Sequence, residues 1–235
     1  MWSYKIMSID KARAVFFDWD GTLVDSFGFL HAAHNHVRGK LDLEPFSLEI
    51  FSTYFGQPRE KLYTLLYGDR QAEARLFFER FVLDNHKDDL KPFECAKEIL
   101  EWFKDQNIIC GVVTNKKGDL VRAEIAHYGW DHLIDVVVGA GEAGEDKPSA
   151  KPLLKAIMDA DLSDQHIEHI WFVGDTDNDL LCADAVGAKA ILIVDHGKYT
   201  TLSAEHKVEK HFEDCKSFYD FLLQSAPNSL KAINE

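Results

Sequence analysis

Two aspartates with one residue between them follow directly on an apolar run near the start of the chain. The run covers residues 14–17, the aspartates are Asp18 and Asp20, and Gly21 and Thr22 come next. Such a run is typical of a buried parallel strand, and ligands of open α/β sheets bind at the carboxyl ends of these strands. Two carboxylates there can bind a cation, and together they can take part in covalent catalysis. An ordinary turn is the alternative interpretation of these residues taken alone.

Polar side chains follow three further apolar runs. Thr114 and Asn115 come after one run, Asp175 and Asp179 come just after another, and Lys147 lies in the loop after a third. Each cluster alone also fits a helix cap, a solvated cation or an acidic turn. Because parallel strands share a direction, we expect all these loops to meet the acidic pair at one edge of the sheet.

Phosphoryl transfer is the chemistry that this set of residues fits. Asp18, the first residue after the strand, is the candidate nucleophile that forms an aspartyl-phosphate. Asp20 is the candidate acid and base, which protonates the leaving oxygen and later accepts a proton from water. The Thr114 hydroxyl, backbone N–H groups near Asn115 and the Lys147 ammonium are candidates for binding the phosphoryl oxygens.

A divalent cation would relieve the repulsion between these carboxylates and a phosphate group. Oxygen ligands together with a phosphate favour Mg²⁺. The candidate ligands are Asp18, the Asp20 carbonyl and Asp175, with Asp179 in or near the outer shell.

The composition favours one large domain or two modest ones. The 235 residues are 46% apolar and carry a formal charge of −14, an acidic balance that argues against nucleic acid as a partner. The four scattered cysteines predict neither a metal site nor disulfides, and Cys110 within an apolar run is expected in the core. Neither a secretory leader nor an apolar run of about 18 residues is evident, so we expect a cytoplasmic protein that does not contact a membrane.

Alternating strands and helices predict an α/β fold with a Rossmann-like parallel sheet. Helical spacing of apolar residues between the strands predicts helices on both faces, for example at Ala96, Ile99, Leu100 and Phe103 and again at Leu153, Leu154, Ile157 and Met158. A last helix is predicted over residues 215–223. The predicted strands are residues 14–17, 108–113, 136–138, 170–173 and 190–194.

The interval of residues 26–92 breaks this alternation. It is too long for a simple crossover, and its apolar positions have helical spacing without a convincing strand. We therefore predict a helical cap over residues 26–92, inserted into a core domain of residues 1–25 and 93–235. The polar residues 85–89 and Pro92 are expected to mark the return to the sheet, and hinges are expected near residues 25–28 and 91–93.

Four segments resemble the ordered motifs of the haloacid dehalogenase-like hydrolases. They are FFDWDGTLVDS, VVTNK, KPSAKP and FVGDTDNDLLCADAVGA, and the helical insert sits where one class of these enzymes carries a cap. In overall style the chain is most similar to the phosphoglycolate phosphatase-like members. The resemblance implies Asp18 as nucleophile, Asp20 as acid and base, Thr114 and Lys147 as phosphate ligands, and Mg²⁺ held by Asp18, Asp20 and Asp175.

Two positions, Asp20 and Thr22, separate branches of this family. The resemblance implies phosphate esters for a chain with Asp20, because the dehalogenases lack an acid there. Thr22 favours a phosphatase, since sugar-phosphate mutases of this type often have valine at that position. Trp19 departs from the commoner aliphatic residue, and we expect it to offer only its backbone to the site.

The predicted function is hydrolysis of a small phosphorylated metabolite by a Mg²⁺-dependent phosphatase, a monomer or homodimer. A phosphomutase of the same fold is the nearest alternative. A binding module without catalytic activity is the alternative from another class, although the intact pair of aspartates argues against it.

Three features of the insert bear on the substrate. Arg59 follows a polar turn and is a candidate for reading a distal carboxylate or second phosphate, or else an ordinary surface arginine. A zinc site is one interpretation of the spacing of His31, His34 and His36, but no further ligand is near in the sequence. We therefore expect at most one of these histidines to face the substrate. Lys116 is expected to add positive potential beside Thr114.

Overall fold

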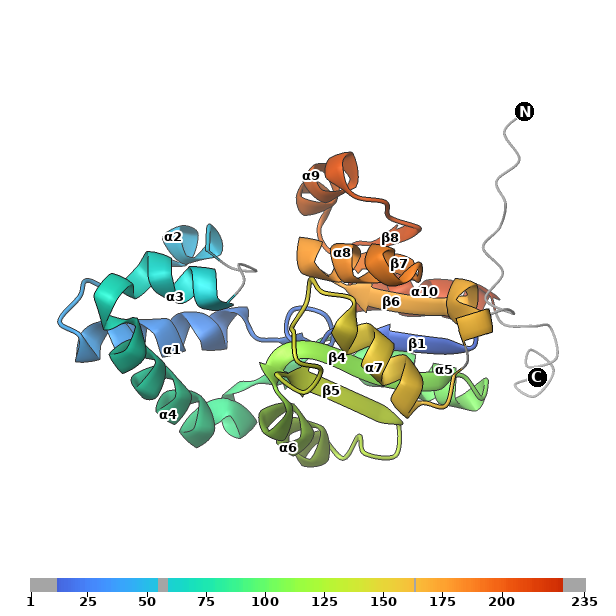
Figure 1. Ribbon diagram of the computed structural model, residues 1–235, viewed down its shortest axis with the longest axis horizontal. Helices are drawn as coiled ribbons and strands as arrows, with labels where there is room; N and C mark the ends of the chain where they lie inside the picture. Colours follow the sequence, from blue (N-terminus) through green and yellow to red (C-terminus); the bar gives the residue numbers. More distant parts are fainter. Residues whose placement is uncertain (1–11, 55–58, 163, 226–235) are drawn as a thin grey trace.

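Six parallel strands form the central sheet of the protein, in the order β5-β4-β1-β6-β7-β8 (Figure 1). The structure is a computed structural model that describes residues 12–54, 59–162 and 164–225. The predicted class, a Rossmann-like parallel sheet with an inserted helical cap, is confirmed. The strands are β1 (Ala14–Phe17), β4 (Ile109–Lys117), β5 (Val136–Ala140), β6 (Ile170–Gly174), β7 (Lys189–Ile193) and β8 (Lys210–Phe212).

Helices cover both faces of the sheet because strand side chains alternate between the faces. In β1, Val15 and Phe17 pack into one apolar core, whereas Ala14 and Phe16 pack into the other, and all four are fully buried. The first core includes α5 (Ala96–Asp105), α6 (Gly118–Tyr128) and α10 (Cys215–Ser225), and the second includes α7 (Lys151–Asp159) and α8 (Asp177–Val186). Helix α9 (His196–Glu205) lies between β7 and β8 in the chain.

All five predicted strands are present, and β8 is the strand of the central sheet that was not predicted. Its three residues, KHF, contain one buried side chain, so no apolar run marks it. The helical spacing in α5 is confirmed by burial of the four predicted positions. The second predicted helix is present as α7, but of its four predicted core positions only Leu153 and Ile157 are buried, while Leu154 and Met158 are 38% and 73% exposed. Cys110 lies in the core, as predicted.

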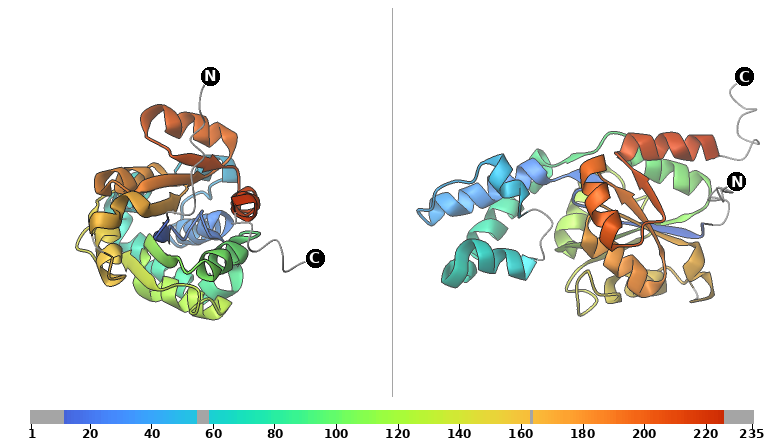
Figure 2. Two further views of the ribbon diagram at one scale, coloured as in Figure 1. Left: turned by 90° about the vertical axis from the view of Figure 1, so that its right-hand side faces the viewer. Right: turned by 90° about the horizontal axis from the view of Figure 1, so that it is seen from above.

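In its described part, the insert between β1 and α5 contains four helices, called the cap below. They are α1 (Phe27–Lys40), α2 (Leu48–Ser52), α3 (Arg59–Tyr67) and α4 (Gln71–Asp89), and a short 3-10 turn, Gly68–Arg70, precedes α4. Figures 1 and 2 show them as a separate lobe beyond the edge of the sheet at which β1 ends. The cap has its own apolar cluster, which includes Tyr63 and Tyr67. Other cap residues, namely Phe29, Ala33 and Val82 of α1 and α4, pack into the first core of the sheet.

The connection between the cap and the sheet differs from the prediction. Strands β2 (Val24–Asp25) and β3 (Lys91–Pro92) pair antiparallel, where no strand was expected. Two residues in each strand are too few to give a pattern of alternation, so the sequence does not mark them. Helix α4 continues to Asp89, so the polar residues 85–89 are not the predicted break. Among the described residues, no helix has the length and apolar character needed to cross a membrane.

Candidate active site

The carboxyl ends of β1, β4 and β6 face the cap across a cavity of about 440 Å³. Its sheet side is lined by Asp18, Asp20, Thr114, Lys147 and Asp175, which come from four separate segments of the chain. Strand β1 is the central partner of β4 and β6, so its end lies where the connections diverge to the two halves of the sheet. The parallel register therefore brings together the residues that the sequence analysis expected to meet.

The turn after β1 packs tightly against Asp175. Gly21 has a φ of +85°, and a Cβ atom at that position would lie 2.7 Å from Asp175 Oδ2. The Thr22 hydroxyl, which is fully buried, donates to Asp175 Oδ1 at 3.4 Å. A glycine is therefore required at position 21, both by the backbone conformation and by the close approach of the carboxylate.

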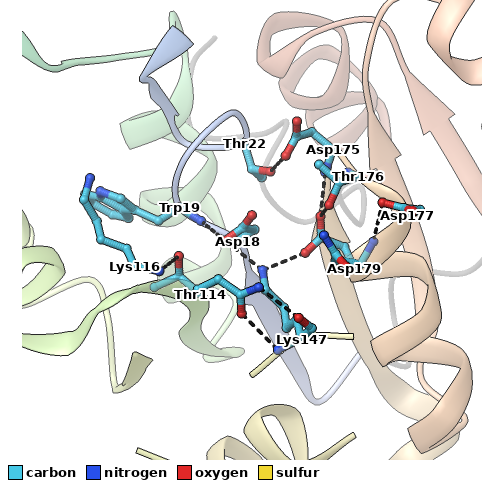
Figure 3. Close-up of polar contacts among 12 residues, drawn as sticks. Asp18, Trp19, Thr22, Thr114, Lys116, Lys147, Asp175, Thr176, Asp177 and Asp179 are labelled. Atoms are coloured by element: carbon cyan, nitrogen blue, oxygen red, sulfur yellow. Dashed lines mark hydrogen bonds and ion pairs between the residues drawn. The ribbon is translucent and has the colours of Figure 1, made fainter. Parts of the chain in front are cut away.

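Lys147 lies between two of the aspartates, as Figure 3 shows. Its Nζ is 2.8 Å from Asp18 Oδ1 and 2.7 Å from Asp179 Oδ1. The Asn115 side chain fixes the backbone of Lys147, because its amide donates to the Lys147 carbonyl and accepts from the Lys147 N–H, both at 2.9 Å. Asn115 thus aligns the loop that carries the ammonium group.

Asp179 has two roles in the site. Besides its contact with Lys147, its Oδ2 accepts from the Thr176 hydroxyl at 2.7 Å and from the Thr176 N–H at 3.0 Å (Figure 3). The bond from the Thr176 N–H is one half of the capping box that begins α8. Its carboxylate is therefore held rigidly behind Asp18 and Asp175.

Burial and mutual repulsion raise the pKa values of two aspartates. Burial, aided by the charges of Asp179 and Asp175, raises the pKa of Asp18 to about 7, although the Lys147 ammonium opposes the shift. Burial likewise raises the pKa of Asp175 to about 6, with Lys198 opposing it from 3.1 Å. The pKa of Lys147 is raised: burial alone would lower it, but Asp179 and Asp18 outweigh that effect. The site thus favours an additional positive charge beside the aspartates.

The three buried aspartates could hold a metal ion. Asp18, Asp175 and Asp179 each offer a carboxylate oxygen, and these oxygens lie within 4.8 Å of one another. A set made only of carboxylate oxygens suits a hard divalent cation such as Mg²⁺. The donor chemistry therefore fits the predicted metal.

Trp19 and Lys116 have partners that the sequence analysis did not expect. The Trp19 side chain is fully buried and its indole N–H donates to Glu124 Oε2 at 2.6 Å, while its backbone N–H donates to Asp18 Oδ1 at 2.7 Å. Lys116 Nζ lies 3.0 Å from Asp20 Oδ1 and 2.8 Å from Glu124 Oε2. Burial alone would lower the pKa of Lys116, but these two carboxylates raise it above its usual value.

Glu124 was missed, although the sequence contains a pattern that could have revealed it. It follows Val121 by three residues and precedes Ile125 and Tyr128 by one and four, so it lies on the apolar face of α6. An acid at a core-facing position needs a buried partner. An acidic residue on the apolar face of a predicted helix therefore indicates a buried polar partner.

The cap side of the cavity is mainly apolar and aromatic. His34 lines it in a fully packed position, where its Nδ1 lies 2.8 Å from the Tyr67 hydroxyl, and burial lowers the pKa of the imidazole to about 4. His31 instead contacts the Phe46 carbonyl at 2.8 Å, and within the described residues the histidines form no metal-binding group. Arg59 begins α3, but its side chain lies outside the described part of the structure.

Comparison with known proteins identifies the family. The model of the family described as haloacid dehalogenase-like hydrolase matches residues 15–193. The chain belongs to this family. The match spans the sheet from β1 to β7 and includes the whole cap, so the family resemblance inferred from four motifs is confirmed over most of the chain.

Several relatives carry phosphatase names. The chain is 29% identical to a phosphoglycolate phosphatase of Neisseria meningitidis, over 84% of this chain and 87% of that protein. It is 30% identical to PpaX of Clostridium perfringens, which has a provisional pyrophosphatase name, over 82% and 87% of the two chains. The crystal structure of a predicted phosphoglycolate phosphatase from Haemophilus somnus 129PT superposes with a TM-score of 0.77 at 25% identity, covering 92% of this chain and 99% of that one. The prediction of an enzyme of the phosphoric monoester hydrolase class is confirmed at the level of the family.

Proposed function

We propose that this hydrolase is a Mg²⁺-dependent phosphatase that releases phosphate from a small phosphomonoester metabolite through an aspartyl-phosphate. The observation that carries the proposal is the convergence of Asp18, Asp20, Thr114, Lys147 and Asp175 on one cavity between sheet and cap. Residues 1–25 and 93–235 form the proposed catalytic core, and residues 26–92 form the proposed cap. The cytoplasmic location stays a prediction.

Asp18 is the proposed nucleophile. Its Oδ1 accepts from the Trp19 N–H at 2.7 Å and contacts Lys147 Nζ at 2.8 Å, so we assign the attack on phosphorus to Oδ2. The phosphoryl group moves to this oxygen as the bond to the leaving oxygen breaks. The Thr114 hydroxyl, the backbone near Asn115 and Lys147 are the proposed donors to the phosphoryl oxygens.

Asp20 is the proposed acid and base. It gives a proton to the leaving oxygen in the first step and takes one from the attacking water in the second, which returns Asp18 to its free carboxylate. Mg²⁺ would be held by Asp18, the Asp20 carbonyl and Asp175, with Asp179 behind them, and when bound it neutralises charge between carboxylate and phosphate. Arg59 stays the predicted substrate-reading residue of the cap.

A panel of phosphomonoesters, with 2-phosphoglycolate and inorganic pyrophosphate included because of the relatives' names, tests this function. We expect phosphate release from at least one monoester, loss of release after chelation of divalent metal, and recovery on addition of Mg²⁺. Asp175→Asn should raise the Mg²⁺ concentration that gives half-maximal rate by about tenfold or more. Release that persists unchanged after chelation contradicts the metal assignment. Phosphoryl return to a sugar without net release would instead identify a mutase.

A further inference from the structure

A buried acid that the proposed reaction does not use, Glu124, lies between the site and the cap. It is fully buried in α6. Its Oε2 accepts from the Trp19 indole at 2.6 Å and lies 2.8 Å from Lys116 Nζ, and its Oε1 lies 2.7 Å from His86 Nδ1. Glu124 thus joins residues from the β1 loop, the end of β4 and cap helix α4.

Lys116 connects Glu124 to the proposed acid and base. Its side chain is 9% exposed, and its ammonium group lies between Glu124 and Asp20, at 2.8 Å and 3.0 Å. A lysine side chain has several rotatable bonds, so one ion pair with a partly exposed aspartate fixes its position poorly. The second, fully buried carboxylate restricts the ammonium to one place, and with it the Asp20 carboxylate.

Packing alone does not explain a glutamate at this position. A buried carboxylate costs several kcal/mol of desolvation unless its partners offset it, and apolar residues of similar size often replace buried ion pairs without loss of stability. The neighbouring core positions on the same face, Val121 and Ile125, are apolar and buried. A carboxylate at position 124 is therefore better explained by its contact with the Lys116 ammonium group, which in turn contacts Asp20.

We propose that Glu124 is a positioning residue that fixes Asp20 through Lys116, and that helix α4 shares in this through His86. The inference rests on the proposed function, because the position of Asp20 matters only if Asp20 delivers the proton to the leaving oxygen. A general acid must lie within hydrogen-bond reach of the atom that it protonates. Removing the contact through which Glu124 and Lys116 hold Asp20 should therefore slow the reaction most for substrates whose leaving group needs protonation.

Phenyl and benzyl phosphate test this, because they are similar in size but differ in leaving group. Phenolate departs readily, whereas the benzyl alkoxide needs a proton. For Glu124→Gln we expect kcat/KM to fall by about tenfold more for benzyl than for phenyl phosphate. Glu142→Gln is the control, since Glu142 also forms an ion pair with a residue of α6, Arg122 at 2.8 Å, and neither of these two residues lines the cavity. Its ratio between the two esters should equal that of the wild type.

A double-mutant cycle separates positioning from general damage to the fold. In an Asp20→Asn background, Glu124→Gln should leave the ester ratio unchanged, because the residue through which it acts is gone. If Glu124→Gln alone fails to fold, the pair Lys116→Met with Glu124→Gln removes both charges, leaves no unpaired ion buried, and should show the same altered ratio. Equal losses for both esters overturn the inference. Absence of phosphate release from every ester with the wild type overturns the proposed function instead.

The contribution of α4 has its own measurement. His86→Phe removes the contact with Glu124 Oε1 while keeping a ring in the buried position. We expect the benzyl-to-phenyl ratio to shift in the same direction as in Glu124→Gln, by about threefold. A wild-type ratio in this variant would exclude α4 from the positioning role.

Discussion

The edge of the sheet and the interior of the cap both bury ionisable side chains, and each stabilises them differently. At the sheet edge, Lys147 is paired with Asp18 and Asp179, so buried charges are matched by opposite charges. In the cap, His34 packs against the ring of Phe78, with 4.8 Å between centroids, and burial keeps it neutral by lowering its pKa to about 4. The sheet edge therefore pairs its buried ions with opposite charges, whereas the cap keeps its buried histidine in the neutral form.

This difference matches a division of tasks in the proposed reaction. A transferring phosphoryl group carries negative charge and needs preorganised donors and cations, which the sheet edge supplies. The rest of the substrate would meet a surface of aromatic and aliphatic residues on the cap, such as Phe29, Phe51 and Leu83. The charged half is thus suited to the reaction and the apolar half to selecting the leaving group.

The largest effect should come from removing the nucleophile in the charged half. For Asp18→Asn we expect the rate of phosphate release to fall by about 10³-fold or more, because an amide cannot form the aspartyl-phosphate. Thermal unfolding should show an unchanged or raised melting temperature, since one of three mutually repelling carboxylates is lost. Asp177→Asn is the control, because Asp177 is an exposed acid that begins α8, two residues after Asp175. Substantial turnover by Asp18→Asn would refute the assignment.

A smaller effect, on the pH dependence of stability, should come from the buried neutral histidine of the cap, His34. His34 titrates near 6.5 when unfolded but near 4 when folded, so between these pH values the unfolded chain binds more protons. The stability that neutral His34 allows is present above pH 6.5 and is lost as the pH falls towards 4. We expect His34→Phe to lessen the drop in unfolding free energy between pH 7 and pH 4 by about 2 kcal/mol.

Denaturant titrations at several pH values measure this difference. His36→Phe serves as the control, because His36 lies on the same helix but is exposed, and it should follow the wild type. Parallel pH curves for wild type and His34→Phe would show that the cap does not hold this imidazole neutral.

The smallest expected effect comes from giving the apolar half a charge. Leu83 lines the cavity and Leu76 does not, although both lie on α4 and are 61% and 69% exposed. Leu83→Lys should raise kcat/KM for 2-phosphoglycolate relative to ethyl phosphate by about threefold, because an exposed ion pair contributes less than about 1 kcal/mol. Leu76→Lys should leave that ratio at the wild-type value. A shift of equal size in both variants would contradict the assignment of the cavity to the leaving group.

The apolar runs and polar clusters were enough to predict five strands and the meeting of Asp18, Thr114, Lys147 and Asp175. Burial of a parallel strand leaves a continuous apolar run, and parallel direction sends the following loops to one edge. Short strands such as β8 (Lys210–Phe212) leave no such pattern and were missed. The arginine predicted to read the substrate, Arg59, remains a prediction.

The sequence by itself determined the residue types and the order of the site, because strand direction turns order along the chain into proximity at an edge. Only the tertiary structure decided the contacts of Trp19, Glu124 and His86, since these depend on how α4 and α6 pack against each other and on the rotamers that result. Nothing local in the sequence specifies that a cap histidine reaches an acid 38 residues further along the chain. Side-chain packing between separate elements therefore supplied the part of the site that no motif contains.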